Sequence, residues 1–245
     1  MLQTTAWARA WTIARMAGAL LILIGVAAQA AKTFSGALEK HQDVATVIVN
    51  FFSFFTVLSN CGACIVLAWA AVWFWTRAKD AGPEPRGLGL ALASVSTYMI
   101  VTGIVYNLLL RGIALPQGTT VWWSNEILHV VGPLFLLLDV FLGPRRRCLG
   151  WGAIGVVLIF PLAWVAYTLI RGELVVNPVT GEHWWYPYPF LNPHLGGYPS
   201  VWPYVVGIAV ALGVVAAGVV WVSRRRGRAA SPDDQSVGSP ALASS

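Results

Sequence analysis

The chain has 245 residues and a net charge of +6. It is 57% hydrophobic and only 11% charged, with a mean hydropathy of +0.67. A soluble domain is about 25% charged, so this composition excludes a soluble globular protein and predicts an integral membrane protein. The positive charges lie between apolar runs, where they orient the chain and meet anionic lipid, so they do not indicate a nucleic-acid partner.

Six apolar runs follow one another along the chain. A helix rises about 1.5 Å per residue, so roughly 20 residues span a bilayer core, and each run predicts one membrane-spanning helix. The predicted fold is therefore all-α, a bundle of six transmembrane helices in one domain over residues 1–228. The polar segment 229–245 is expected to be a disordered cytoplasmic tail. The predicted helices lie near residues 12–31, 47–75, 88–110, 122–143, 150–170 and 201–223.

The first run has two interpretations. Its charged start, apolar middle and small-residue end, VAAQAAK, are typical of a signal peptide. Five further apolar runs follow it, and we expect the first run to be retained as a membrane helix.

The basic residues predict the orientation of the bundle, because cytoplasmic loops carry an excess of Lys and Arg. One side carries Arg9, Arg15, Arg77, Lys79, Arg86, Arg145, Arg146, Arg147, Arg224, Arg225, Arg226 and Arg228. The other side carries Lys32, Lys40, Arg111 and Arg171. Both termini are therefore predicted to be cytoplasmic. We interpret the run 145–147 as a topology anchor without chemistry, and expect Asp139 to pair with nearby arginines.

The second predicted helix, 47–75, carries a row of polar residues. Ser53, Thr56, Asn60 and Cys64 follow at steps of three, four and four, which places them on one helical face. Thr56 is expected about nine residues, roughly 13 Å, below the outer end. Small hydroxyl residues such as Ser53 are typical of close helix packing, whereas a buried amide such as Asn60 needs partners on another helix.

The fourth predicted helix, 122–143, places His129 about seven residues in, roughly 10 Å deep and level with Thr56. Asn125 and Glu126 precede it on the same face and are expected to fix one imidazole tautomer. Pro133 removes the helical donor of the His129 carbonyl, which a neighbour or water must then satisfy. A polar pocket around His129, opening to the outer leaflet between the second and fourth helices, explains this pattern. A structural histidine beside a simple proline kink explains it equally.

Two further features reach the same outer level. The third predicted helix ends with Tyr106, Asn107 and Arg111, residue types that anchor helices at membrane interfaces. The long segment 172–202 is dense in Trp, Tyr, Pro and Gly, which is typical of an interfacial aromatic belt and equally of a lid over a site.

Metal and haem sites are not predicted, because His129 is the only histidine in a predicted membrane helix. We therefore expect no cofactor. The pair Cys61 and Cys64 forms a CxxC motif, so a membrane redox protein remains an alternative, although disulfide exchange needs a second dithiol.

Thr56 and His129 together suggest nucleophilic chemistry on an ester. Thr56 would attack the ester carbonyl, while His129 would accept its proton and return it to the leaving alcohol. The amide of Asn60, one turn from Thr56, is a candidate donor to the oxyanion. A non-catalytic protein that binds or carries a small lipophile explains the same pocket.

Three motifs in the chain resemble those of the bacterial Pr6Pr family: FFTVLSN (54–60), LHVVGPLFLLLD (128–139) and WYPYPFLN (185–192). That family is distantly similar to the eukaryotic androgen-induced-gene-1/FAR-17a group. The resemblance implies a six-span protein of the bacterial plasma membrane with Thr56 as nucleophile and His129 as base. It also implies a lipid-like fatty acyl ester as substrate and membrane lipids as partners. The residues after Thr56 follow the bacterial pattern and not the eukaryotic one.

Overall fold

The structure is a computed structural model that describes residues 4–77, 82–113 and 120–229. All regular elements within these residues are helical, and six helices are long and apolar enough to cross a membrane. The predicted all-α fold with six spans is confirmed. Residues 230–245 of the expected tail 229–245 and Lys79 lie outside the described residues, and Ala229 is the last residue of the final helix.

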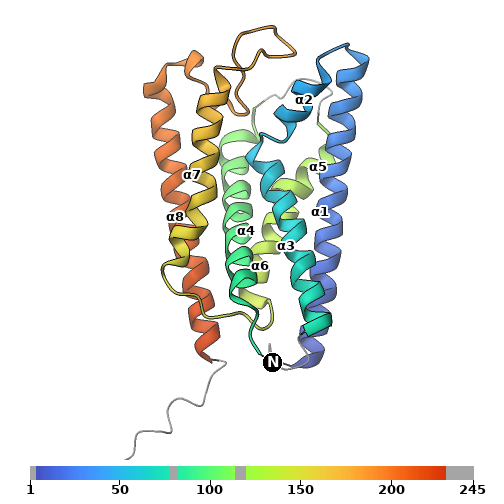
Figure 1. Ribbon diagram of the computed structural model, residues 1–245, viewed down its shortest axis with the longest axis vertical. Helices are drawn as coiled ribbons and strands as arrows, with labels where there is room; N and C mark the ends of the chain where they lie inside the picture. The colour runs from blue at the N-terminus through green and yellow to red at the C-terminus, as the bar shows by residue number, and fades with distance from the viewer. Residues whose placement is uncertain (1–3, 78–81, 114–119, 230–245) are drawn as a thin grey trace, which may run out of the picture.

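The spans follow one another up and down the bundle (Figure 1). Two of them include short π-helical segments, in which hydrogen bonds join residues five positions apart. In chain order the elements are α1 (Thr5–Glu39), α2 (Val44–Phe51), α3 (Phe55–Arg77), α4 (Arg86–Val105), the π-helix η2 (Tyr106–Leu110), α5 (Trp122–Glu126), the π-helix η3 (Ile127–Val131), α6 (Gly132–Leu142), α7 (Ala153–Gly172), the 3₁₀ turns η4 (Pro189–Leu191) and η5 (Pro193–Leu195), and α8 (Tyr198–Ala229).

The predicted helix 47–75 is wrong as one continuous element. The chain breaks between α2 and α3, and α2 slants across the outer end of the bundle (Figure 1). Side chains of α7 bind the polar groups of this break: Trp164 Nε1 donates to the Ser53 carbonyl at 3.0 Å, and the Tyr167 hydroxyl lies 3.1 Å from Ser53 Oγ. Thr56 is consequently the second residue of α3, at the helix N-terminus, and not a residue deep within a long helix.

Two apolar clusters divide the bundle into two bodies. The first cluster joins α1, α3, α4 and the α5–η3–α6 span, and includes Leu67, Met99 and Leu136. The second joins α4 with α7 and α8, and includes Val157 and Val220. Because α4 contributes to both clusters, it is the central helix, and the α7–α8 pair stands to one side of the other four spans (Figure 1).

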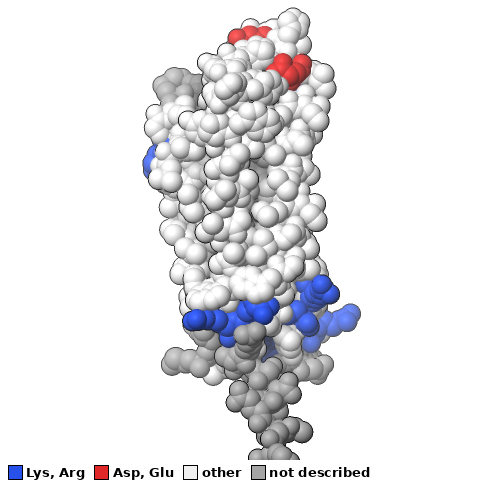
Figure 2. Space-filling view, turned by 90° about the vertical axis from the view of Figure 1, so that its left-hand side faces the viewer, with Lys and Arg blue, Asp and Glu red and all other residues white. Residues whose placement is uncertain are grey.

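The start of α1 and the end of α8 lie at the same end of the bundle (Figure 1). Lys and Arg side chains gather there (Figure 2), which is the pattern that marks a cytoplasmic end. Asp139 pairs there with Arg15 at 2.8 Å and with Arg146 at 2.5 Å, as predicted for arginines near Asp139. Within the run 145–147, which stays a predicted topology anchor, Arg146 also has a structural role, because its side chain is buried in this ion cluster. Arg15 makes α1 an integral part of the bundle.

Candidate functional site

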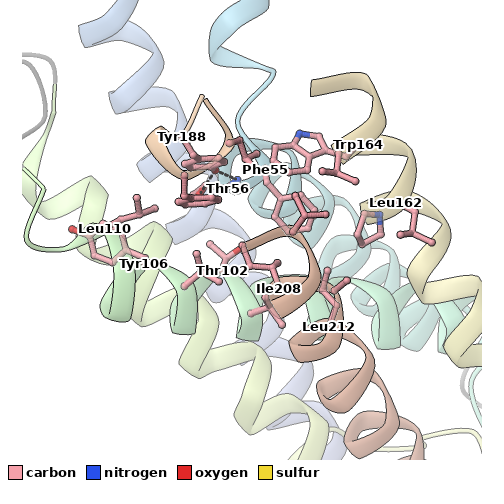
Figure 3. Close-up of a pocket in the computed structure, with 18 of the residues that line it drawn as sticks. Phe55, Thr56, Thr102, Tyr106, Leu110, Leu162, Trp164, Tyr188, Ile208 and Leu212 are labelled. Atoms are coloured by element: carbon pink, nitrogen blue, oxygen red, sulfur yellow. Dashed lines mark hydrogen bonds between the residues drawn. The ribbon is translucent and has the colours of Figure 1, made fainter. Parts of the chain in front are cut away.

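A cavity lies between α3–α4 and the α7–α8 pair (Figure 3). It lies near the N-terminus of α3, at the end of the bundle opposite the start of α1 and the end of α8 (Figure 1). Its volume is about 130 Å³. Most of the wall is aliphatic or aromatic, and hydroxyl groups come from Thr56, Thr102, Tyr106 and Tyr188. The predicted position between the second and fourth spans is wrong for this cavity, because its far wall is built by α7, α8 and the loop that joins them.

Thr56 and Tyr188 form the polar end of the cavity (Figure 3). The Tyr188 hydroxyl accepts a hydrogen bond from the backbone N–H of Thr56 at 3.3 Å, and it lies 3.3 Å from Thr56 Oγ1. Both residues are buried. Burial raises the pKa of the Tyr188 phenol, partly offset by its bonds to Thr56, so the phenol stays protonated. The cavity thus ends in two hydroxyls at the N-terminus of α3, where the helix dipole favours negative charge.

The loop between α7 and α8 folds back over α7 and carries Tyr188 to this position. Trp185 N donates to the carbonyl of Gly172 at 2.8 Å. Glu173 accepts a hydrogen bond from the Tyr186 hydroxyl at 2.7 Å and pairs with His194 Nε2 at 3.1 Å. The hydrogen bond from the Tyr186 hydroxyl, with a smaller contribution from His194, lowers the pKa of the Glu173 carboxyl. Aromatic residues of the predicted lid therefore line the cavity, and Glu173 ties both flanks of that stretch to the end of α7.

His129 is bound on the other side of α4. Its Nδ1 lies 2.9 Å from the backbone carbonyl of Asn125, which assigns the ring proton to Nδ1 and leaves Nε2 as an acceptor. The imidazole stacks on the Tyr106 ring with centroids 3.9 Å apart. Asn125 holds the tautomer through its backbone, while its side chain donates to the Tyr106 hydroxyl. Glu126 pairs instead with Arg111 at 2.9 Å.

The carbonyls freed near Pro133 are bound by two asparagines. In η3 the N–H of Gly132 bonds the carbonyl of Ile127, so the carbonyl of Leu128 would need the N–H of residue 133, which proline lacks. Asn60 Nδ2 donates to that carbonyl at 3.2 Å. The carbonyl next to it, on His129, receives the amide of Asn107 at 3.5 Å. The expectation that a neighbour must satisfy this part of the backbone is confirmed.

Thr56 and His129 do not share a hydrogen bond in the structure. The partner of Thr56 is Tyr188, and His129 does not line the cavity, although Tyr106 contacts both. Asn60 Nδ2 already donates twice, to the carbonyls of Thr56 and Leu128, so it has no free hydrogen for an oxyanion. Its Oδ1 is buried without a partner among the described residues.

The remaining predicted polar groups lie away from the cavity. Ser53 belongs to the break before α3. Cys64 donates to the carbonyl of Ala19 at 3.4 Å, so this end of the CxxC pair faces α1, and both thiols are free. Within the described part of the chain no cluster of three or more His, Cys, Asp or Glu side chains is placed to hold a metal ion.

Sequence reasoning missed the contribution of α7, α8 and Tyr188 to the site. The density of aromatic residues in 184–190 was the available signal, but it did not tell which ring reaches into the bundle. Comparison of the chain with models of known protein families, with curated proteins and with solved structures found no match.

Proposed function

We propose that this multi-pass membrane protein binds a lipid-like molecule in the cavity between α3–α4 and α7–α8. Its polar group would lie against Thr56 and Tyr188, and its apolar chain would run inward along α7 and α8. The observation that supports this most is the pairing of a nearly all-carbon wall with the two adjacent hydroxyls of Thr56 and Tyr188 at one end. Small-molecule sites have this character, a hydrophobic lining with a few placed polar groups.

The length of the cavity indicates the part of the ligand that it takes. Lining residues run from Val101 to Leu110 on the third span and from Val205 to Leu212 on the sixth. At about 1.5 Å per residue these stretches cover roughly 10–14 Å, the scale of one acyl chain. Leu162, which lines the cavity, is 56% exposed on the lipid-facing surface, so a chain can enter sideways from the outer leaflet.

Photocrosslinking tests this proposal. Purified protein in detergent is irradiated with a fatty acid that carries a terminal diazirine, and the labelled peptides are identified by mass spectrometry. We expect label on α7 and α8 lining residues. Ala209→Trp, which fills the cavity, should remove most of it, whereas Val210→Trp should not, because Val210 is 59% exposed and does not line the cavity. Equal labelling of both variants would refute binding in the cavity.

Ester hydrolysis with Thr56 as nucleophile is the second candidate function. Thr56 Oγ1 lies at the polar end of the cavity beside the N-terminus of α3, whose N–H groups suit an oxyanion. The resemblance to the Pr6Pr family supports the same chemistry with His129 as base. Binding is favoured because no described lining residue is a histidine or carboxylate, and a protonated phenol is a poor base.

Labelling with a serine/threonine-directed fluorophosphonate separates the two candidates. An esterase predicts labelling of the wild type that Thr56→Ala and His129→Ala each abolish, while Cys61→Ala leaves it unchanged. A binding protein predicts no specific label in the wild type or in any of the three variants.

We further propose, from the composition and the resemblance, that the membrane is a bacterial plasma membrane.

A further inference from the structure

The wall of the cavity carries no ionised side chain among the described residues. It is built from aliphatic, aromatic and hydroxyl-bearing side chains, and it includes no Lys, Arg, His, Asp or Glu. The stretches of α4, α7 and α8 that line it, 101–105, 158–165 and 205–212, contain none of these residue types. Residues 114–119, which lie outside the described part of the chain, contain none either. A charged ligand would therefore find no counter-ion on the described wall.

The charged groups on the surrounding elements have other partners. Arg111 lies over the Tyr106 ring, 5.4 Å from its centroid, but it pairs with Glu126 at 2.9 Å. Arg171, near the end of α7, donates to Asn50 Oδ1 at 2.8 Å. Neither arginine lines the cavity. The same holds for the histidines and carboxylates of η3 and of the segment 172–202, which are His129, Glu173, Glu182, His183 and His194.

The hydroxyls of Thr56 and Tyr188 can together donate one hydrogen bond to a ligand. The Tyr188 oxygen accepts from the N–H of Thr56, and the two hydroxyls share a hydrogen bond of 3.3 Å. Whichever hydroxyl donates in that bond, the hydrogen of the other has no further acceptor in the described structure. The polar end therefore suits a ligand oxygen such as that of an alcohol, an ester carbonyl or a protonated acid.

Two opposing effects determine whether that oxygen can belong to an ionised group. The N-terminus of α3 favours an anion, with at most about half an elementary charge, and its Thr56 N–H is already bound to Tyr188. Against this, a carboxylate that enters an apolar site loses its hydration and needs a paired charge with several hydrogen bonds in return. One hydroxyl donor and a partial charge do not replace that hydration, so a carboxyl in the cavity favours its protonated form.

We infer that the cavity selects lipids whose polar group is uncharged, such as long-chain alcohols and esters, over ionised amphiphiles. This inference names the ligand class of the proposed lipid binding and rests on it. The fatty acid of the photocrosslinking experiment then binds as the neutral acid.

Competition between photocrosslinking ligands tests this selectivity. The full-length protein in an uncharged detergent is labelled with a fatty alcohol that carries a terminal diazirine, in the presence of dodecan-1-ol, methyl dodecanoate or dodecanoic acid. The amount of each competitor in the micelles is measured, so that differences in partitioning do not enter the comparison. We expect the alcohol and the ester to compete at similar concentrations. The acid should need roughly tenfold more at about pH 9, where it is ionised, and should approach the alcohol at about pH 5.

Phe190→Lys supplies the charge that the described wall lacks. The ring of Phe190 stacks on that of Tyr188 with centroids 5.2 Å apart and is only half-buried, so a lysine there can keep its ammonium group near water. At high pH this variant should bind dodecanoate several-fold better, relative to the alcohol, than the wild type does. Phe190→Gln loses the ring without adding a charge, so it is the matched control and should keep the wild-type ratio.

Two outcomes would overturn the selectivity: ionised dodecanoate that competes as well as dodecan-1-ol in the wild type, or the same ratio of the two in Phe190→Lys and in Phe190→Gln. The wild-type comparison does not depend on the folding of any variant. Failure of the proposed function looks different. The alcohol probe would then label the wild type and Ala209→Trp equally, and none of the three competitors would reduce the label.

Discussion

Several polar side chains inside this bundle donate hydrogen bonds to backbone carbonyls that have lost their helical donor. Asn60, Asn107 and Tyr98 donate to carbonyls that lie four or five residues before a proline. Water is absent from the hydrocarbon core, so a carbonyl there cannot be satisfied by solvent. Each of these side-chain hydrogen bonds is therefore required where a proline interrupts a span. The amide of Asn60, a candidate for chemistry from the sequence, is thereby occupied by structure.

Asn60→Ala should destabilise the protein by about 1 kcal/mol, a typical value for a hydrogen bond between membrane helices. The reason is that the Leu128 carbonyl would lose its donor, while Pro133 prevents a backbone replacement. Thermal unfolding in detergent measures the change. Cys61→Ala, at the next position of α3, is the control and should have a smaller effect because no hydrogen bond of Cys61 is found in the described structure. Equal melting temperatures for the two variants would contradict this assignment.

At the scale of elements, prolines and breaks position the site. The sequence was sufficient to predict six spans, since each needs only length and hydropathy. It was also sufficient to predict that Pro133 frees backbone near His129. It was insufficient for the break at 52–54, because Phe52, Ser53 and Phe54 continue an apolar run and the break is stabilised by Trp164 and Tyr167 from more than a hundred residues away. Local periodicity does not contain such partners.

The hydrogen bond from the Tyr98 hydroxyl to the Val157 carbonyl, near Pro161, can be tested by a double-mutant cycle. Pro161 leaves the Val157 carbonyl without a helical donor, and the Tyr98 hydroxyl donates to it at 2.6 Å. We expect Tyr98→Phe to cost about 1 kcal/mol in the wild type and close to nothing in a Pro161→Ala background, where the restored N–H takes the carbonyl. Unfolding free energies of the four proteins give the coupling. Strict additivity would show that the hydroxyl does not serve the proline.

The loop between α7 and α8 depends on a glycine at the end of α7. A Cβ on Gly172 would lie 2.3 Å from the Tyr186 ring, so Gly172→Ala must displace that ring from Glu173. We expect this to shift the nearby Tyr188 as well. The expected result is weaker binding of the diazirine fatty acid, by several-fold in apparent affinity.

Gly207→Ala is the matched control, because no atom lies within 4 Å of the place its Cβ would take and alanine favours a helix. It should leave binding unchanged. Retained affinity in Gly172→Ala would show that the loop does not shape the cavity.

At the scale of the whole molecule, the two ends of the bundle have different roles. The basic end is closed by the buried pairs of Asp139 with Arg15 and Arg146, which join α1, α6 and the segment after α6. The opposite end holds the cavity, which lies at the interface between the first four spans and the α7–α8 pair. The sequence indicated the charges at the first end and the aromatic residues at the second. It did not indicate that the interface between the first four spans and the α7–α8 pair runs along α4. The hydropathy of a single span does not determine which other helices it packs against.

This division predicts that stability and ligand binding can be separated. Asp139→Asn leaves the buried guanidinium of Arg15 without its carboxylate and leaves Arg146 with Glu84 alone, 3.8 Å away, and it should lower the free energy of unfolding by about 3–5 kcal/mol. Glu126→Gln removes a pair with Arg111 whose side chains are 39% and 46% exposed, and should cost about 0–1 kcal/mol.

Below its melting temperature, the Asp139 variant should nevertheless bind the diazirine fatty acid with the affinity of the wild type, because its cluster lies at the end of the bundle opposite the cavity. Melting curves and photocrosslinking on the same preparations test both statements. A loss of binding in step with the loss of stability would show that the Asp139 cluster at the basic end and the cavity wall along α4 act as one unit.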